Sequence, residues 1–530
     1  MRRPNILFIL TDQWHPRCTG YAGHPVVRTP HLDAMAERGM IFERMYTPVP
    51  LCAPARASIF TGLTPRGHGV RMNGIPLRPE ISTFVEALRQ AGYRTHGVGK
   101  IHFGTYGIPN GRLLNEVDPN ECPEASALWW SGRIKKLPLP YFGFETIDFA
   151  NGDGQYVYGD YLHWLEREHP ESARMLKEPG TIGPTSPAFK LYNRETFKWA
   201  LPAAHHQAPW IVDRCIDFLG TRKAKTSLSS VMIDEPPFFL FCSFNDPHPP
   251  FAAPHPYCEA YDPKLIPPPL ERAGELDNLP PHFRAMVEEG IITSGNRAEP
   301  MQATRPHYRE CAAQYFGQIK LFDDQLGRLL AALKASGEEE NTLVVFTADH
   351  GEALGDHGLW GKGPYHFDGV IRVPCLASWP GRISPGSRVR APCTLLDLAP
   401  TFLDCAHVDI PGSHPVDPPE AEAAPPAWPG LSLLSLLDGK TSLEERSIVV
   451  ETDEDYLGFK MRTLVTRRYR LTMYSNREYG ELFDLQADPN EFNNLWDRLE
   501  ARELRWGLSE QLLHELVRTD ISLPRQASRS

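Results

Sequence analysis

The stretch Pro4-Asn5-Ile6-Leu7-Phe8-Ile9-Leu10-Thr11-Asp12-Gln13 joins a short apolar run to two polar side chains. An apolar run of this length predicts a strand that is buried on both faces, as in a parallel sheet. The run is too short for the core of a signal peptide. Asp12 and Gln13 would then lie where the strand ends, at the edge at which ligands gather in α/β sheets.

Three further apolar runs have the same form, and each of them also ends in polar residues. They are residues 93–98 before Lys100 and His102, residues 238–244 before His248, and residues 343–347 before Asp349 and His350. Parallel strands place their carboxyl ends at one edge of the sheet, so these side chains are expected to lie close together.

Helical patterns separate the apolar runs. Thr29 is placed to cap a helix with Pro30 at its first position and Gly39 just past its end. A longer amphipathic pattern over residues 315–333 stops at Gly337. Strands that alternate with helices predict an α/β fold, with a large, mostly parallel sheet sandwiched by helices.

The remainder of the chain has other patterns. Residues 104–235 and 250–305 are rich in Pro and aromatic residues, which favours loops and short helices over the site. Residues 407–429 are a Pro/Ala/Glu-rich connector, and short alternating runs follow it. These runs predict a small antiparallel sheet, on which a helix over residues 499–517 would pack through Leu504, Leu508, Leu512 and Leu516. We therefore expect a catalytic domain over residues 1–430 and a C-terminal subdomain over residues 431–530.

Composition limits the possible partners. The 530 residues carry a net charge of -11, which gives no reason to expect nucleic acid. An anionic substrate would need a local basic cluster. No apolar run has the length of a membrane span, so no membrane is expected. The 10 cysteines form no CxxC pair, which favours a reduced, cytoplasmic protein over a zinc ribbon or a disulfide framework.

One cysteine has a distinctive setting. Cys52 opens the run Cys52-Ala53-Pro54-Ala55-Arg56, a Cys-x-Pro-x-Arg pattern. The pattern lies between a Pro-rich loop and a helix-like stretch over residues 55–61. A single cysteine is more often a small buried apolar residue than a catalytic one, so the pattern needs support from its surroundings.

Two groups of polar residues supply that support. Asp12, Gln13, Asp349 and His350 together offer oxygen atoms and one imidazole nitrogen, a set that suits a divalent ion, although Asp at a strand end often only caps a turn. A second group supplies cations and proton donors, and its members are Arg56, Lys100, His102, His248 and Lys362. Each of these residue types is common on a protein surface or in a turn. Together they would indicate an active site if the sheet places them around Cys52.

With these motifs in order, the chain resembles the formylglycine-dependent sulfatases of the alkaline phosphatase superfamily. The similarity runs from Asn5 to about Leu495. The matching pieces are Pro4-Asn5-Ile6-Leu7 with Asp12, Thr29-Pro30-His31-Leu32-Asp33, the Cys52 pattern, Gly99-Lys100-Ile101-His102, Thr347-Ala348-Asp349-His350-Gly351-Glu352, Lys362, and Glu481-Leu482-Phe483-Asp484-Leu485 with Asp488-Pro489 and Asn494-Leu495. The resemblance implies that a formylglycine-generating enzyme oxidises Cys52 to an aldehyde, whose hydrate is the nucleophile beside one divalent metal ion, manganese or calcium.

The resemblance also implies roles for the other residues. Asp12, Gln13, Asp349, His350 and modified Cys52 would hold the metal. Arg56 would orient the diol, and Lys100 and Lys362 would bind the nonbridging oxygens of a small anionic ester. His248 would protonate the leaving group, His102 would act as the base for product release, and Asn73 would contact the ester. A homo-oligomer is possible.

Two positions depart from the commonest sulfatase pattern. Gln13 stands where most members have a second Asp, and His350 stands where most have Asn, as in phosphonate monoester hydrolases and nearby broad-specificity arylsulfatases. Lys100 and His102 match ordinary sulfatases. The leading prediction is hydrolysis of aryl or small alkyl sulfates, and the alternative is a phosphonate monoester or phosphodiester hydrolase. A catalytically silent binding protein with an unmodified Cys52 is a third reading.

Overall fold

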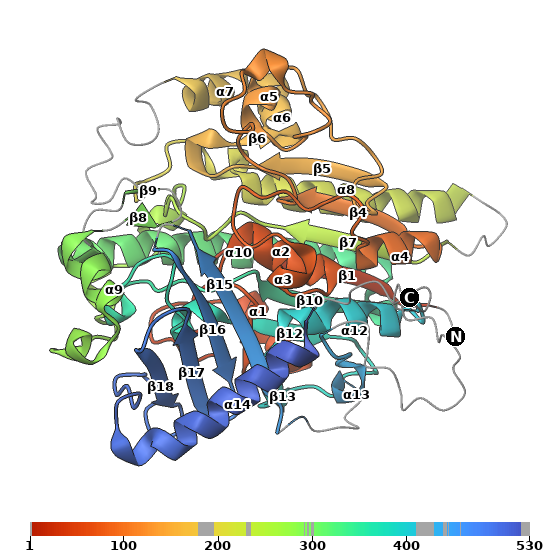
Figure 1. Cartoon of the computed structure of the whole chain (residues 1–530). Coiled ribbons are helices and arrows are strands. Elements are labelled where there is room, and N and C mark those ends of the chain that lie inside the picture. Colours follow the sequence, from red (N-terminus) through yellow and green to blue (C-terminus); the bar gives the residue numbers. More distant parts are fainter. Residues whose placement is uncertain are drawn as a thin grey trace, which may run out of the picture.

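The computed structural model describes residues 3–178, 196–228, 235–290, 292–293, 296–297, 301–409, 429–437, 443, 445–455 and 457–520. Within these ranges the main element is a nine-stranded sheet in the order β13-β2-β12-β10-β1-β7-β4-β5-β6. Its strands are β1 (Asn5–Thr11), β2 (Met40–Phe42), β4 (Arg94–Gly99), β5 (Thr146–Asn151), β6 (Tyr158–Gly159), β7 (Phe238–Ser243), β10 (Thr342–Ala348), β12 (Cys375–Ser378) and β13 (Ser387–Val389). Figure 1 shows them stacked from β5 down to β12.

The four predicted strands form the parallel centre of this sheet. β1 pairs in parallel with β10 on one side and with β7 on the other, and β4 pairs in parallel with β7. In this register Thr11 is the partner of Ala348, so the residues that follow β1 and β10 leave the sheet at the same edge. The predicted mostly parallel α/β sheet is confirmed.

Aromatic pairs join the sheet to helices on both faces. On one face Phe8 contacts Phe60 of α2 (Cys52–Thr61) and Phe402 of α12 (Leu398–Cys405), and α4 (Phe84–Gln90) packs beside them. On the other face Phe346 contacts Phe322 of α10 (Tyr308–Ser336). α1 (Pro30–Arg38) packs against α10. Burial of both faces explains why the central strands are almost continuously apolar.

Two helix ends differ from each other in how they are capped. Gly337 follows α10 with a φ of 78°, so the predicted stop is confirmed. Thr29 occupies the N-cap position of α1, but its side chain does not cap the helix. The N–H groups of His31 and Leu32 instead donate to Asp323 of α10, at 3.1 and 2.9 Å. A carboxylate from a helix that is distant in the sequence thus accepts the hydrogen bonds that an N-cap side chain usually accepts.

The expectation of only loops and short helices over residues 104–235 is wrong in two respects. α8 (Gln207–Leu228) is a long helix, and its Phe218 contacts Phe238 of β7. β5 adds a parallel strand beside β4. The high content of Pro and aromatic residues had favoured loops in this region. The aromatic side chains are instead buried, where they pack against the sheet. The shorter elements include α3 (Pro65–His68), α5 (Ser126–Trp130), α6 (Asp160–Glu168), α7 (Pro170–Lys177), α9 (Pro281–Arg284), α11 (Asp368–Ile371), α13 (Leu434–Leu437), β3 (Met45–Tyr46), β11 (Arg372–Val373) and β14 (Cys393–Thr394).

A separate antiparallel sheet follows in the order β15-β16-β17-β18, as predicted. Its strands are Ile448–Glu454, Phe459–Val465, Tyr469–Tyr474 and Gly480–Asp484. α14 (Arg502–Arg518) packs on it through buried Leu508 and Leu512, with Leu504 and Leu516 partly buried. The backbone N–H of Glu451 donates to the carbonyl of Pro48 at 2.8 Å, so β15 supports the loop that leads to Cys52. Most of the predicted connector, residues 410–428, lies outside the described residues, and the boundary at residue 430 stays a prediction.

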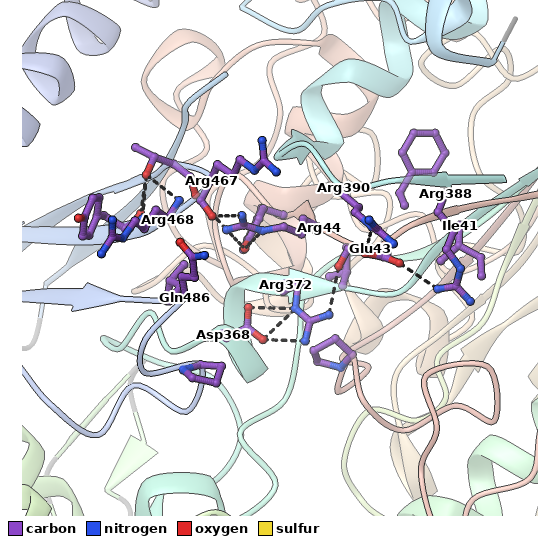
Figure 2. A pocket seen from close by; sticks show the side chains of 18 of the residues that line it. Ile41, Glu43, Arg44, Asp368, Arg372, Arg388, Arg390, Arg467, Arg468 and Gln486 are labelled. Atoms are coloured by element: carbon purple, nitrogen blue, oxygen red, sulfur yellow. Dashed lines mark hydrogen bonds and ion pairs between the residues drawn. The ribbon is translucent and has the colours of Figure 1, made fainter. Parts of the chain in front are cut away.

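A large cleft of about 1050 Å³ separates this second sheet from the region around β2 and β3 (Figure 2). Its lining is rich in arginine: Arg17, Arg44, Arg372, Arg388, Arg390, Arg467 and Arg468. Several of these charges are balanced locally, because Arg372 pairs with Asp368 at 2.7 Å and Arg388 pairs with Glu43 at 2.9 Å. The predicted site residues do not line this cleft. None of the helices in the described ranges is both long and apolar enough to span a bilayer.

Candidate active site

Cys52 is the first residue of α2, which begins three residues before the predicted helix-like stretch. Leu51 before it is extended, with φ -138° and ψ 137°. Pro54 is compatible with this early start because N–H groups in a first helical turn have no intrahelical partner. Asn73 Oδ1 accepts a hydrogen bond from the backbone N–H of Ala53 at 3.0 Å. The side chain predicted to contact the ester therefore also holds the start of α2.

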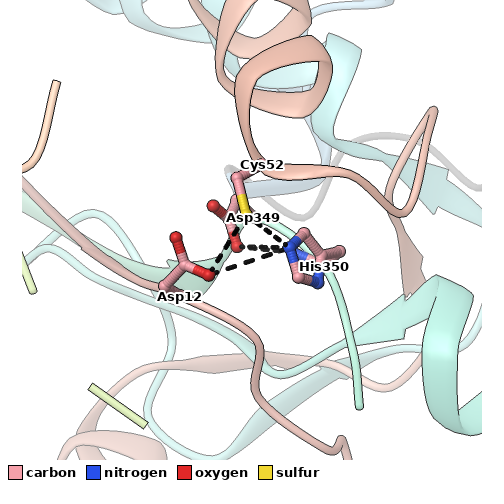
Figure 3. Close-up of side chains that lie close together, drawn as sticks. All are labelled: Asp12, Cys52, Asp349 and His350. Atoms are coloured by element: carbon pink, nitrogen blue, oxygen red, sulfur yellow. Dashed lines mark hydrogen bonds and ion pairs between the residues drawn. The ribbon is translucent and has the colours of Figure 1, made fainter. Parts of the chain in front are cut away.

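The thiol of Cys52 lies among groups that come from distant parts of the chain. Its Sγ is 3.3 Å from His350 Nε2, 3.5 Å from Asp12 Oδ1 and 2.8 Å from Lys362 Nζ. Figure 3 shows Cys52 above the two carboxylates and the imidazole ring. Asp12 follows β1 and His350 follows β10, so the parallel pairing of these strands assembles the cluster.

The cluster has the donors of a metal centre. Ligand atoms of Asp12, Cys52, Asp349 and His350 all lie within 4.8 Å of one another, and all four side chains are buried. His350 Nδ1 is 2.9 Å from the carbonyl of Gly351, so Nδ1–H donates there and the lone pair of Nε2 is directed into the cluster. Two carboxylates and an imidazole nitrogen fit a divalent ion such as manganese or calcium.

Gln13 lies at the rim of this cluster. Its φ of 58° is unusual for a non-glycine residue, and its backbone N–H donates to Asp349 Oδ1 at 3.2 Å. Its Oε1 accepts from Lys362 Nζ at 2.7 Å, and its Nε2 donates to buried Glu352. The side-chain oxygen therefore points toward the site, as a metal ligand at this position would require.

Arg56 is completely buried beneath the carboxylates. Its Nε pairs with Asp349 at 2.8 Å, and its Nη2 pairs with Asp12 at 3.2 Å. Its Nη1 donates to the Lys100 carbonyl and to Ser243 Oγ, both at 2.9 Å. These bonds indicate that Arg56 orients the two acidic side chains, and its contact with a diol at residue 52, which the family resemblance implies, stays a prediction.

Lys100 and His102 form a wall beside the carboxylates. Lys100 Nζ is 3.0 Å from Asp12 Oδ2 and lies over the ring of Tyr106 at 5.6 Å. The His102 ring stacks on Tyr106 with the centroids 4.1 Å apart. The backbone N–H of His102 donates to buried Glu124 at 2.9 Å, which holds a residue whose φ is 61°.

His248 approaches from the loop after β7. Its Nδ1 is 2.6 Å from the Pro249 carbonyl and 3.4 Å from Asp153 Oδ2. The Pro249 carbonyl and the Asp153 carboxylate are both hydrogen-bond acceptors, so Nδ1 of His248 is the nitrogen that donates to them. Nε2 then remains to interact with a substrate. The side chain is 21% exposed, more than any other histidine of the site, which suits a group that meets the leaving part of an ester.

Burial and neighbouring charges shift the pKa values of several ionisable groups in the site. Burial opposes ionisation of Asp12, yet the neighbouring Lys100, His248, Lys362 and Arg56 hold the pKa of its carboxyl well below the usual range. Burial and the neighbouring charge of Asp12 raise the pKa of Asp349. Burial, together with Lys100 and Arg56, lowers the pKa of His102 well below its ordinary value. His102 is therefore a neutral imidazole, and one of its ring nitrogens keeps a lone pair.

Several residues of the site were not predicted from the sequence. Tyr106, Glu124 and Asp153 come from the region without strand and helix rhythm, and Ser243 ends β7. Ser243 could have been found because it ends a predicted strand, whereas Asp153 follows β5, a strand that the sequence did not indicate. Glu352 belonged to the quoted Thr347–Glu352 motif, but no role was assigned to it.

The parallel sheet and this buried, cation-ringed cluster define an enzyme for small anionic esters. The family model described as Sulfatase matches residues 4–112 and 149–408, and a second model, described as N-sulphoglucosamine sulphohydrolase, C-terminal, matches residues 420–518. The chain belongs to the sulfatase family, and it is a sulfuric ester hydrolase.

Sulfatases and a phosphonate monoester hydrolase both resemble this chain over nearly its whole length. An arylsulfatase of Clostridium perfringens (strain 13 / Type A) is 29% identical over 524 residues, with 97% of this chain and 94% of the relative covered. A choline-sulfatase of Rhizobium meliloti (strain 1021) is 27% identical, with 93% and 82% covered. The crystal structure of the phosphonate monoester hydrolase of Agrobacterium radiobacter superposes with a TM-score of 0.75 at 26% identity, with 98% of this chain and 96% of that chain covered.

Proposed function

We propose that the protein hydrolyses sulfate monoesters of aryl or small alkyl alcohols, with residue 52 as a formylglycine nucleophile. The observation that carries this proposal is the position of Cys52. Its Sγ lies 2.8 Å from Lys362 Nζ and 3.5 Å from Asp12 Oδ1, at the start of a helix and inside the candidate metal cluster. Lys362 and the N-terminus of α2 both place positive charge beside this atom, which favours an anion there.

The metal would supply positive charge that acidifies the attacking hydroxyl and polarises the ester. Lys100 and Lys362 would bind the nonbridging oxygens, on which negative charge grows in the transition state. One hydroxyl of the hydrated aldehyde at residue 52 loses its proton to water and attacks sulfur. The bond from sulfur to the leaving oxygen breaks, and His248 gives that oxygen a proton, which His248 regains from water before the next turnover.

Release of sulfate needs the second hydroxyl of residue 52. His102, held neutral by its surroundings, takes the proton of this hydroxyl, the bond from carbon to the sulfate oxygen breaks, and the aldehyde forms again. Water then rehydrates the aldehyde. The two histidines therefore have opposite tasks, one as acid and one as base.

Modification of residue 52 separates an enzyme of this type from a silent binding protein. The protein should be produced in a host that contains a formylglycine-generating enzyme, and the peptide with residue 52 analysed by mass spectrometry. We expect the aldehyde in place of the thiol, in proportion to specific activity. Full activity from protein whose residue 52 is entirely cysteine would contradict the proposal.

We expect the metal site to accept manganese at least as well as calcium. Only two carboxylates, Asp12 and Asp349, balance the ion, and His350 offers nitrogen where calcium prefers oxygen. The measurement is activity and metal content after chelation and reconstitution with each ion. His350→Asn is the matched variant, and it should shift the preference toward calcium. Activity with calcium and none with manganese in the wild type would show that this prediction is wrong.

A phosphonate monoester hydrolase is the second candidate, because the solved structure of such an enzyme resembles this chain. His350 belongs to the metal cluster and Gln13 lies at its rim, and these two residue types are the ones in which the chain resembles such enzymes. We nevertheless expect a higher kcat/KM for an aryl sulfate. A phosphonate needs room for a carbon substituent where a sulfate has only oxygen. The side chains of Lys100 and His102 are buried, and the His102 ring is stacked on Tyr106. We expect their hydrogen-bond donors to occupy the space that the carbon substituent of a phosphonate would need.

The comparison should use 4-nitrophenyl sulfate and a phenyl phosphonate monoester with matched leaving groups. Shortening Lys100 and His102 together should depress sulfate hydrolysis more than phosphonate hydrolysis. A tenfold or greater preference of the wild type for the phosphonate, on the order of 1.4 kcal/mol in transition-state binding, would instead favour the second candidate.

A further inference from the structure

A small cavity of about 20 Å³ lies behind His248, where the loop after β7 meets α8 and α10. Side-chain oxygens of the residues that line it are buried and have no hydrogen-bond partner within the described part of the chain. These oxygens are Gln207 Oε1, Asn245 Oδ1, Asp246 Oδ2 and Gln318 Oε1. Buried polar atoms without a partner are rare in folded proteins, so a group of them in one cavity indicates a ligand.

The orientation of the three amides is fixed by their NH₂ groups. Each NH₂ group donates to an oxygen acceptor, so that turning the amide over would place oxygen against oxygen. The contacts are Gln318 Nε2 to Asp246 Oδ1 at 3.0 Å and to the Pro250 carbonyl at 3.2 Å, Asn245 Nδ2 to the Gly152 carbonyl at 2.8 Å and to Asp153 Oδ1 at 3.3 Å, and Gln207 Nε2 to the Gly152 carbonyl at 3.3 Å. The carbonyl oxygens are therefore left without donors by the network itself.

Neighbouring groups cannot supply enough donors. His206 Nδ1 lies 3.8 Å from Asp246 Oδ2, but it already accepts from the N–H of Ala208 at 3.3 Å. Trp199 Nε1 is a buried donor at the same cavity and can serve one oxygen. The volume holds about one water molecule, which donates two hydrogen bonds at most. One water therefore leaves an oxygen unsatisfied even with the help of Trp199.

We propose that this cavity binds a potassium ion through the Asp246 carboxylate and the amide oxygens of Gln318, Asn245 and Gln207. Ligands that are all oxygen suit a hard cation. Two carboxylates line the cavity, and the oxygens of Asp153 already face Asn245 Nδ2 and His248 Nδ1. Buried Asp246 is the carboxylate that remains, so a single positive charge is enough to neutralise it. Burial also raises the pKa of Asp246, and the His206 imidazole 3.8 Å away offsets this rise only in part.

A cation at this position would hold the segment that carries His248. Asp246 lies two residues before His248, and its backbone carbonyl accepts from the N–H of Asp12 at 3.3 Å. Asn245 also contacts Asp153, the carboxylate beside the His248 ring. The cation would thus act as a positioning element for His248, and this consequence alone rests on the proposed function.

Anomalous diffraction from crystals soaked in rubidium chloride tests the site without any measurement of activity. We expect a rubidium peak between Asp246 and Gln318 in the wild type, and none in Gln318→Met or in Asp246→Asn, two variants of similar shape. Gln314→Met is the matched control, because Gln314 lies one turn earlier on α10 and outside the cavity. It should retain the peak.

Any other content of the cavity overturns the proposal. A water without anomalous signal would do so, as would an empty cavity in which a protonated Asp246 donates to an amide. Thermal unfolding gives a second reading, since a ligand that binds only the folded state raises the melting temperature. We expect the wild type to gain about 1–2 °C in potassium chloride over tetramethylammonium chloride at equal ionic strength, and the Gln318→Met variant to gain nothing.

Discussion

Replacing Cys52 with alanine is expected to lower turnover by at least about 10,000-fold, because the covalent step loses its nucleophile. The fold should persist. Cys52 is the first residue of α2, while the packing of that helix on the sheet depends on residues farther along, such as Phe60. The measurements are steady-state hydrolysis of 4-nitrophenyl sulfate and the melting temperature.

Cys52→Ser should be nearly as inactive in the steady state, for a different reason. A serine hydroxyl can attack the ester, but the resulting ester has no second hydroxyl whose ionisation expels sulfate. Cys258→Ala is the control, since Cys258 lies in the short helical turn Tyr257–Glu259 away from the cluster and should keep full activity. Retention of a tenth or more of wild-type turnover by either Cys52 variant would overturn the assignment of the nucleophile.

His248→Ala is expected to slow hydrolysis of an alkyl sulfate by about 100-fold to 10,000-fold, and that of 4-nitrophenyl sulfate far less. An alkoxide needs a proton in order to leave, whereas a nitrophenolate leaves without one. The geometry agrees with this role, because Nδ1 of His248 faces the Pro249 carbonyl and Asp153, and Nε2 remains for the substrate. The measurement is kcat/KM on a series of esters with leaving groups of increasing pKa.

His255→Ala provides the control for this series. His255 lies on the same loop with its side chain 76% exposed, so its loss should leave the dependence on leaving group unchanged. Equal losses on alkyl and nitrophenyl esters in His248→Ala would assign His248 to binding or to support of Asp12, whose carboxyl lies within its electrostatic reach.

Much of the fold followed from local patterns. The apolar run before Asp12 and the one before Asp349 predicted β1 and β10, and the alternating runs near the C-terminus predicted the second sheet. These elements were predictable because a strand buried on both faces needs apolar residues throughout. α8 was missed because it lies in a stretch rich in Pro and aromatic residues, and its helical pattern was read as loop.

For this protein, the sequence alone determined which residue types stand at the strand ends, the pattern around Cys52 and the family resemblance. Only the tertiary structure decided which of these groups meet. Arg56 turns to Asp12 and Asp349 instead of Cys52, Lys362 reaches the thiol from a distant loop, and Asn245, Asp246 and Gln318 form a cavity of unpaired oxygens. The physical reason is that hydrogen bonds and ion pairs depend on distances of a few ångströms. Those distances are set by the packing of segments that are far apart in the chain, from 44 residues for Arg56 and Asp12 to 310 for Lys362 and Cys52, and no local pattern records them.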